Sequence, residues 1–196
     1  NHTIVFNNLV FRRFWRLCIL IAFIFAVAAN PHRSLSALIP DSIDPWVHVP
    51  IHQQWRRGFE AKELLAQIPR NSSVASETHL IPQLAKRRVI LRFPENDHYK
   101  DIHRVTKGVD FIVSQPRFNM AYAPAFRHHA DWVSNSIDRM EYLLSKGEYG
   151  VSHCNRNGIV LQIGRITTSD QAQCFANEIS FARKALLKTS RKVKHK

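Results

Sequence analysis

The stretch from Ile68 to Pro94 constrains the fold most strongly, because it predicts two strands joined by a short helix. Residues 73–76 form a short, apolar-flanked run that is typical of a buried strand. Residues 79–86 predict a helix that Thr78 can cap and whose proline lies within about its first turn. Residues 89–93 predict a second strand, which the following proline ends. This order is that of a βαβ unit, in which a crossover helix joins parallel strands.

The rest of the chain supplies further elements of both types. The Asn-Gly pair at 157–158 is a strong hairpin signal, because both residues tolerate positive φ. Residues 95–108 are polar and predict a surface helix or loop, and residues 115–130 predict a loop. The other predicted elements are an amphipathic helix over 51–67, a central strand over 109–114, a helix over 131–146, hairpin strands over 149–154 and 159–163, and a last helix capped by Ser169 or Asp170.

These elements predict an α/β domain with a mixed sheet of about five strands and a C-terminal helix. The first three strands are expected to be parallel, and the last two form the hairpin. Both faces of a central strand are covered, so Val109, Phe111 and Val113 are expected to be buried on one face and Ile112 on the other. The apolar stripe of the helix over 51–67 is expected to contain Trp55, Phe59, Leu64 and Ile68.

The net charge of the 196-residue chain is +13, and the excess lies at its two ends. Residues 1–30 contain three arginines and no acid, and residues 165–196 contain 8 Lys and Arg against 2 acids. Residues 31–164 hold 17 Lys and Arg against 13 acids, which is ordinary for a globular domain. The basic tail at 188–196 is expected to be solvated. Nucleic acid is not a predicted partner, because the basic residues are not interleaved with aromatic residues in a platform.

The longest apolar run, Leu17–Ala29, has 13 residues and no charge. A membrane-spanning helix needs roughly 20 residues. Apolar residues upstream can extend the run if Arg12, Arg13 and Arg16 reach toward lipid headgroups. The same segment also fits a cleaved signal peptide, with Ala26-Val27-Ala28 near the cleavage site, or a buried core helix.

Several motifs, taken in their order, resemble one known family. They are Pro-x-x-Ser-x-Val at 69–74, Leu-x-Pro-x-Leu at 80–84, Arg-Arg-x-Ile at 87–90, Val-Asp-Phe-Ile-Val at 109–113, Gly-Glu-Tyr-Gly-Val at 147–151 and Gly-Ile-Val-Leu-Gln at 158–162, with 30–35 and 39–43 upstream. The chain resembles the C-terminal part of the polytopic membrane proteins catalogued as domain of unknown function 2079, over roughly residues 12 to 187. That family is common in cyanobacteria and is distantly similar to membrane glycosyltransferases that use lipid-phosphate sugars.

The resemblance implies how the chain is divided and placed. It favours the transmembrane interpretation of the N-terminal run, with the arginine end cytoplasmic and the rest on the outer face, in the periplasm or the thylakoid lumen. The expected segments are a transmembrane helix at 1–30, an extended connector at 31–50, an α/β extramembrane domain at 51–164, and a C-terminal helix with a basic tail at 165–196. The lipid bilayer, and other membrane protein subunits, are the expected partners.

Six residues are candidates for the membrane-interface or substrate side: Arg12, Arg13, Arg16, Asp41, Trp46 and Trp55. Tryptophan rings are favoured at membrane interfaces, although both tryptophans can equally pack on the domain. Asp41 lies in the sequence Ile-Pro-Asp-Ser-Ile, where it either positions a substrate or caps a turn.

No catalytic, cofactor-binding or metal-ligating residue is predicted. The 11 histidines include no His-Glu-x-x-His motif, and the 6 glycines include no phosphate-binding loop. No Gly-x-Ser-x-Gly elbow is present. In the similar glycosyltransferases the catalytic acid lies in a loop that would precede residue 1. Cys154 and Cys174 either pair outside the cytosol or remain two partly buried thiols.

Two functions are compatible with this sequence. The first is a non-catalytic C-terminal extramembrane domain of a glycosyltransferase-like membrane protein of unknown substrate. The second is an accessory subunit with a single membrane span, docked on a larger membrane complex, such as a photosynthetic one. Both hypotheses predict that residues 1–196 alone transfer no sugar.

Overall fold

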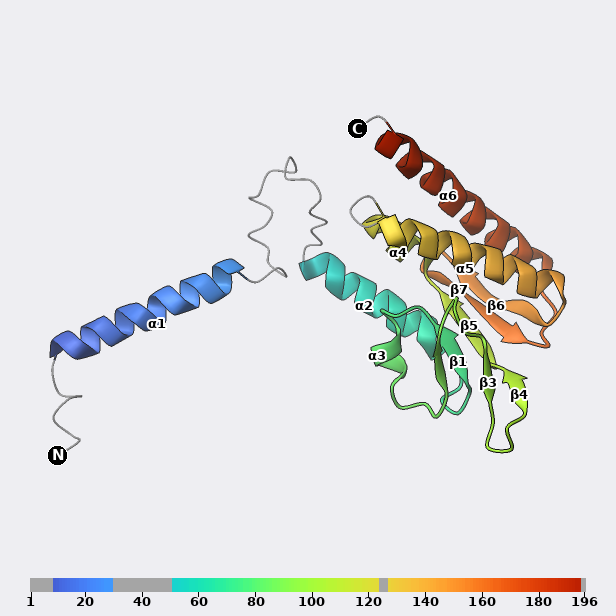
Figure 1. Ribbon diagram of the computed structural model, residues 1–196, viewed down its shortest axis with the longest axis horizontal. Coiled ribbons are helices and arrows are strands. Elements are labelled where there is room, and N and C mark those ends of the chain that lie inside the picture. Colours follow the sequence, from blue (N-terminus) through green and yellow to red (C-terminus); the bar gives the residue numbers. More distant parts are fainter. Residues whose placement is uncertain (1–8, 30–50, 124–126, 195–196) are drawn as a thin grey trace. The chain divides into compact units, whose positions relative to one another are not determined.

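The computed structural model describes residues 9–29, 51–123 and 127–194 (Figure 1). The chain divides into two compact units, residues 1–55 and 56–196. The connector at 31–50, with Asp41 and Trp46, lies outside the described residues. The division into four segments expected from the sequence therefore stays a prediction.

Helix α1 (Leu9–Ala29) and the first five residues of α2 (Ile51–Ala66) are the described part of the first unit. Among the described residues no helix is long and apolar enough to cross a membrane. The transmembrane helix expected at 1–30 is therefore not borne out among the described residues, and residues 1–8 and 30 lie outside them. The physical reason is that α1 begins at Leu9, so Arg12, Arg13 and Arg16 lie inside the helix. The uncharged remainder would span about 20 Å at 1.5 Å per residue, and a bilayer core is about 30 Å thick.

A five-stranded mixed sheet forms the centre of the second unit, as the sequence predicts. Its order is β2-β1-β5-β7-β6. The first three strands, β1, β2 and β5, are parallel, and β7 pairs antiparallel with both β5 and β6. The strands are β1 (Val74–Ser76), β2 (Ile90–Arg92), β5 (Phe111–Ser114), β6 (Tyr149–Asn155) and β7 (Gly158–Ile163).

Apolar side chains bury both faces of this sheet. On one face Ala75 and Ile112 pack with α5 (Arg127–Ser145) and α6 (Ser169–Lys194), which run side by side in Figure 1. On the other face Phe111 and Val113 pack with α2 (Ile51–Ala66). Val109 belongs to the Ile112 side, contrary to expectation, because β5 begins only at Phe111 and the alternation of a strand does not extend back to residue 109.

The buried face of α2 differs from the predicted stripe. Leu64 and Ile68 are buried as expected, together with Ala61 and Leu65. Trp55 and Phe59, however, are 70% and 72% exposed. The residues of α2 that pack with the sheet, Ala61, Leu64 and Leu65, all lie in the C-terminal half of the helix, whereas Trp55 and Phe59 precede them.

One predicted element is shorter than expected, and two segments form elements that the sequence pattern did not indicate. The short helix α3 spans Ile81–Leu84, with Leu80 rather than Thr78 at its N-terminal cap. Helix α4 (Pro116–Tyr122) occupies the expected loop, with proline at its first position. Strands β3 (His98–Lys100) and β4 (Thr106–Gly108) form a hairpin. Asp101 builds its turn, because its carboxylate accepts hydrogen bonds from the backbone of His103 and Val105.

Buried polar contacts hold the parallel strands β1 and β5 together at both ends. At the amino ends, the Asp110 carboxylate accepts hydrogen bonds from the amide and hydroxyl of Ser73, at 2.7 and 2.8 Å. At the carboxyl ends, Glu77 accepts hydrogen bonds from the Ser114 hydroxyl (2.6 Å) and the Gln115 amide (2.9 Å). The carboxyl ends of the two strands are therefore fixed side by side.

Candidate ligand-binding cleft

The carboxyl edge of β1 and β5 is a topological switch point. From β1 the chain continues to β2 on one side, and it then returns to β5 on the other side. In open α/β sheets, ligands bind in the crevice outside the carboxyl ends of the strands at such a point. Glu77 and Gln115 are the residues that follow these two strands. The fold therefore directs attention to the surface around Gln115.

A cleft with a volume of about 670 Å³ opens at this surface. Four parts of the chain line it: the middle of α2, the start of α4, the turn between β6 and β7, and the C-terminal half of α6. The lining residues are Arg56, Arg57, Glu60, Gln115, Arg117, Phe118, Met120, Ala121, Arg156, Asn157, Phe181, Ala185 and Lys188. The size is that of an ordinary small-molecule site.

Positive charge dominates the cleft. Glu60 is the acid in the lining, and it lies 3.6 Å from Arg56. Arg57, Arg156 and Lys188 have no carboxylate partner among the residues that the structure describes. Three cations from α2, the β6–β7 turn and α6 therefore remain to attract an anion.

Gln115 connects the cleft to the buried polar groups behind it. Its side-chain amide donates to the backbone oxygen of Asn157 at 2.6 Å, and its carbonyl oxygen lies 2.8 Å from Nε2 of His79. The His79 ring stacks on Phe118, with 3.8 Å between the ring centroids.

Glu77 and His79 have strongly shifted pKa values. Burial raises the pKa of the Glu77 carboxyl to about 7, although hydrogen bonds from Ser114 and Gln115 oppose the shift. Burial lowers the pKa of the His79 imidazole to about 4. The two groups lie 3.9 Å apart, but His79 is neutral at neutral pH, so the pair is not an ion pair there.

Glu77 and His79 are both engaged by other groups of the protein. Glu77 is only 1% exposed, and both groups are held by the protein's own hydrogen bonds. Within the described ranges, no group of three or more His, Cys, Asp or Glu is arranged to hold a metal ion. A carboxyl with a pKa near 7 is suitable for proton transfer, but here it lies behind Gln115.

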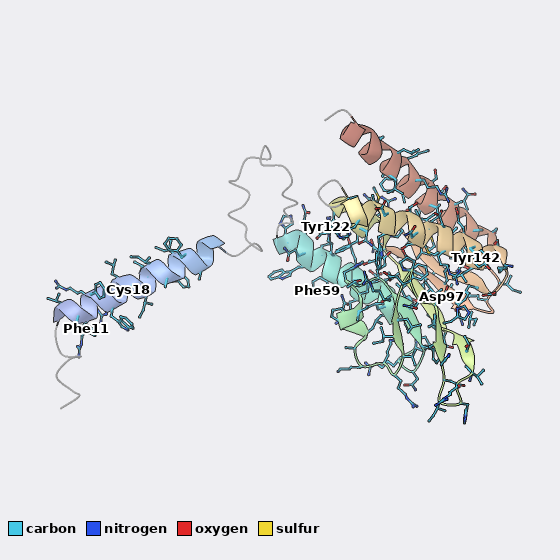
Figure 2. All side chains as sticks on the ribbon, viewed as in Figure 1. Phe11, Cys18, Phe59, Asp97, Tyr122 and Tyr142 are labelled. Carbon is cyan, nitrogen blue, oxygen red and sulfur yellow. A yellow bond between two sulfur atoms is a disulfide. The ribbon has the colours of Figure 1, made fainter. Side chains whose placement is uncertain are left out.

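The residues predicted from the sequence lie elsewhere. Arg12, Arg13 and Arg16 are exposed on α1, and Trp55 is exposed on α2 (Figure 2 shows α1 with Phe11 and Cys18 labelled). None of these four lines the cleft. Cys154 and Cys174 form a disulfide that joins β6 to α6.

The cleft residues were missed because most of them carry no local signal. Gln115 is the exception, since it directly follows a predicted parallel strand, and that position alone marks a candidate site. Arg57, Arg156 and Lys188 are far apart in the sequence and come to line one cleft only in the fold. The excess of positive charge near the C-terminus predicts a solvated tail, and it does not indicate that Lys188 lines a binding site.

Comparison with known proteins places the chain in a family. The family model described as predicted membrane protein (DUF2079) matches residues 2–161. No curated protein and no solved structure matches the chain. The matched region covers most of the 196 residues and includes α2, α4, α5 and the sheet as far as the middle of β7. The chain therefore belongs to the DUF2079 family of predicted membrane proteins.

Proposed function

We propose that the α/β unit is an accessory domain of a membrane protein that binds an anionic ligand and has no catalytic role of its own. The observation that carries this proposal is the cleft at the carboxyl edge of the sheet, where three cations lack a carboxylate partner among the described residues. Glu77 and His79, which contact the cleft residue Gln115 or its backbone, are engaged by protein groups. Such a site attracts an anion without presenting an activated nucleophile to it.

The proposal extends to the kind of membrane protein. We place the domain at the C-terminal end of a glycosyltransferase-like protein of the cyanobacterial type, on the periplasmic or lumenal side. The ordered motifs between residues 69 and 162 support this assignment, as does membership of a predicted membrane protein family. The disulfide between Cys154 and Cys174 supports an oxidising compartment, because such bonds persist outside the reducing cytosol.

One observation favours the second candidate, an accessory subunit docked on a larger membrane complex. Phe59, labelled in Figure 2, is 72% exposed, and Trp55 lies one turn before it on the same helix. Two large aromatic side chains on an unpacked helix face are typical of residues that contact a partner. This candidate needs no ligand in the cleft.

The test uses the full 196-residue chain in detergent. Inorganic pyrophosphate, titrated in a calorimeter, should bind to the wild type. Binding should be lost when Arg156→Gln is combined with Lys188→Gln, and it should be kept in Arg88→Gln, an exposed arginine outside the cleft. Incubation with labelled polyprenyl-phosphate sugars should give no transfer.

Two results would contradict the proposal. Sugar transfer that disappears in Asp41→Asn would make the Ile-Pro-Asp-Ser-Ile segment an active site. The absence of pyrophosphate binding, together with co-purification of the chain with a membrane complex that Phe59→Ser abolishes, would favour the docked subunit.

A further inference from the structure

Two chemically different sets of residues line the cleft, and we call them its cationic half and its apolar half. One half carries the unmatched cations Arg57, Arg156 and Lys188, and the other carries apolar surface from α4 and α6. A site for a small inorganic anion needs only the first half. The apolar half therefore indicates, independently of the cations, that the ligand also has an apolar part.

In the cationic half, Arg57 is held in place without losing its charge. Its guanidinium donates a hydrogen bond to the hydroxyl of Tyr122 at 3.2 Å, and it lies 5.3 Å from the centre of the Phe118 ring. Tyr122 is labelled in Figure 2 at the end of α4. Neither contact neutralises the positive charge. The planar fork of arginine matches the oxygens of a phosphate group.

Arg156 and Lys188 add two further charges from other elements. Both side chains are exposed, one in the β6–β7 turn and the other on α6. A phosphate monoester carries about −1.5 to −2 charges at neutral pH and offers three acceptor oxygens, so it can engage all three cations. A carboxylate carries a single charge and uses this arrangement less well.

The apolar half consists of Phe118, Met120, Ala121, Phe181 and Ala185. Phe181 is 44% exposed, although α6 is otherwise packed on the domain through Ile179 and Ala182. Arg117 lies over its ring at 3.9 Å. This arginine is neutralised by Glu178 through two hydrogen bonds of 2.7 and 2.8 Å, so it extends the flat surface without adding free charge.

We infer that the cleft binds a phosphate-bearing lipid, with the phosphate on Arg57, Arg156 and Lys188 and the first part of the chain on Phe118 and Phe181. The inference rests on the proposed function, namely that the cleft is an anion site, and it specifies the ligand. Membership of a predicted membrane protein family gives such a lipid a source, because the bilayer presents phosphates on apolar chains.

Three probes test the two halves separately on the full chain. Dodecyl phosphate has both parts, inorganic phosphate lacks the chain, and dodecyl maltoside lacks the charge. Dodecyl phosphate, kept below the concentration at which it forms micelles, should bind at least about 100-fold more tightly than inorganic phosphate. The reason is that each methylene that leaves water tightens binding about fourfold, so four buried methylenes suffice.

Matched variants assign each half to its residues. Arg57→Gln should weaken binding of dodecyl phosphate and of inorganic phosphate by similar factors. Phe181→Ser should weaken only dodecyl phosphate, by about tenfold, because it removes apolar contact and leaves the cations in place. The controls are Arg88→Gln and Phe59→Ser, an exposed arginine and an exposed phenylalanine outside the cleft, and neither should change the affinity.

Vesicles test the lipid source. Phosphatidylcholine vesicles that contain phosphatidic acid should displace dodecyl phosphate from the wild type, and vesicles of phosphatidylcholine alone should not. Failure of the phosphatidic acid vesicles to compete would overturn the assignment to a membrane lipid.

The remaining outcomes separate this inference from the function on which it rests. Equal affinity for inorganic and dodecyl phosphate would leave an anion site and overturn the lipid inference alone. Equal affinity for dodecyl maltoside and dodecyl phosphate would show an apolar site and overturn both. If none of the three probes binds, the proposed function fails as well.

Discussion

Removing Glu77 and removing His79 should change the pH dependence of the free energy of unfolding in opposite directions. The two side chains lie 3.9 Å apart at the carboxyl end of β1, and burial shifts their pKa values in opposite directions. Because the shifts are of similar size, their effects on the free energy of unfolding should nearly cancel in the wild type. Substitution of one group exposes the effect of the other.

Glu77 favours the folded state at low pH. Its pKa rises from 4.5 in the unfolded chain to about 7 in the folded domain, so the folded state binds more protons between these values. The free energy of unfolding therefore falls as the pH rises through this window. A shift of this size corresponds to about 3 kcal/mol, at 1.36 kcal/mol per pKa unit, and the carboxyl is too buried for solvent to screen it.

His79 acts in the other direction. Its pKa falls from 6.5 to about 4 on folding, so the unfolded chain binds more protons between these values and stability rises with pH. Between pH 4.5 and 6.5 the two slopes oppose each other, and the wild-type profile should be nearly flat. Above pH 6.5 only Glu77 still titrates, so stability should fall toward pH 7.

The assay is urea unfolding at several pH values, followed by circular dichroism with the disulfide intact. Between pH 4.5 and 6.5, stability should rise by about 2–3 kcal/mol in Glu77→Gln and fall by a similar amount in His79→Gln. Each variant also changes absolute stability through lost hydrogen bonds, so the slope is the diagnostic quantity. Glu63→Gln, on the exposed face of α2, is the control and should follow the wild type. Flat profiles in both buried variants would refute the reasoning.

Three further predictions concern the stability of the domain. Phe111→Ala should lower the free energy of unfolding by about 3–5 kcal/mol, because the ring is 7% exposed and packs against α2, and a loss under about 1 kcal/mol in denaturant titration would contradict this packing. Cys174→Ser should lower it by about 3 kcal/mol under oxidising conditions, and should have no effect once the wild type is reduced, because the disulfide closes a separation of 20 residues. Gly150→Ala should lower the melting temperature, at a cost of at least about 2 kcal/mol, because the new methyl group would lie 2.1 Å from the backbone oxygen of Arg165, and Gly58→Ala, which meets no atom within 4 Å, is the matched control.

The five strands of the sheet were predictable because their signals are local. Val89–Phe93 and Phe111–Ser114 are runs of apolar residues bounded by proline or polar residues, and the Asn-Gly pair at 157–158 specifies the hairpin. The parallel arrangement followed from the short helix between the first two strands. These features depend on neighbouring residues, so a single sequence is enough to identify them.

The elements that were missed depend on contacts between distant residues. Trp55 and Phe59 fit the spacing of an apolar stripe, and only the length of sheet beneath α2 decides that they stay exposed. In the same way, Arg57 and Lys188 lie on two helices at opposite ends of the domain sequence and meet only in the fold. In helix α1 the apolar run alone suggests that Arg12, Arg13 and Arg16 flank the helix. In the structure these three arginines lie inside the helix.

The way in which the sheet combines parallel and antiparallel pairing has a consequence for the order of folding. In the β6–β7 hairpin, the paired residues Asn155 and Gly158 are only three positions apart in the sequence. Ser73 and Asp110, whose hydrogen bonds join β1 to β5, are 37 positions apart in the sequence. Closing a long loop costs more entropy than closing a tight turn, and non-local pairing is slower. We therefore expect the amide hydrogens of β7 to become protected from exchange first during refolding. The β1–β5 edge, where Glu77 and Gln115 border the cleft, should be protected last, so a partly folded domain would have its hairpin before it has a binding site.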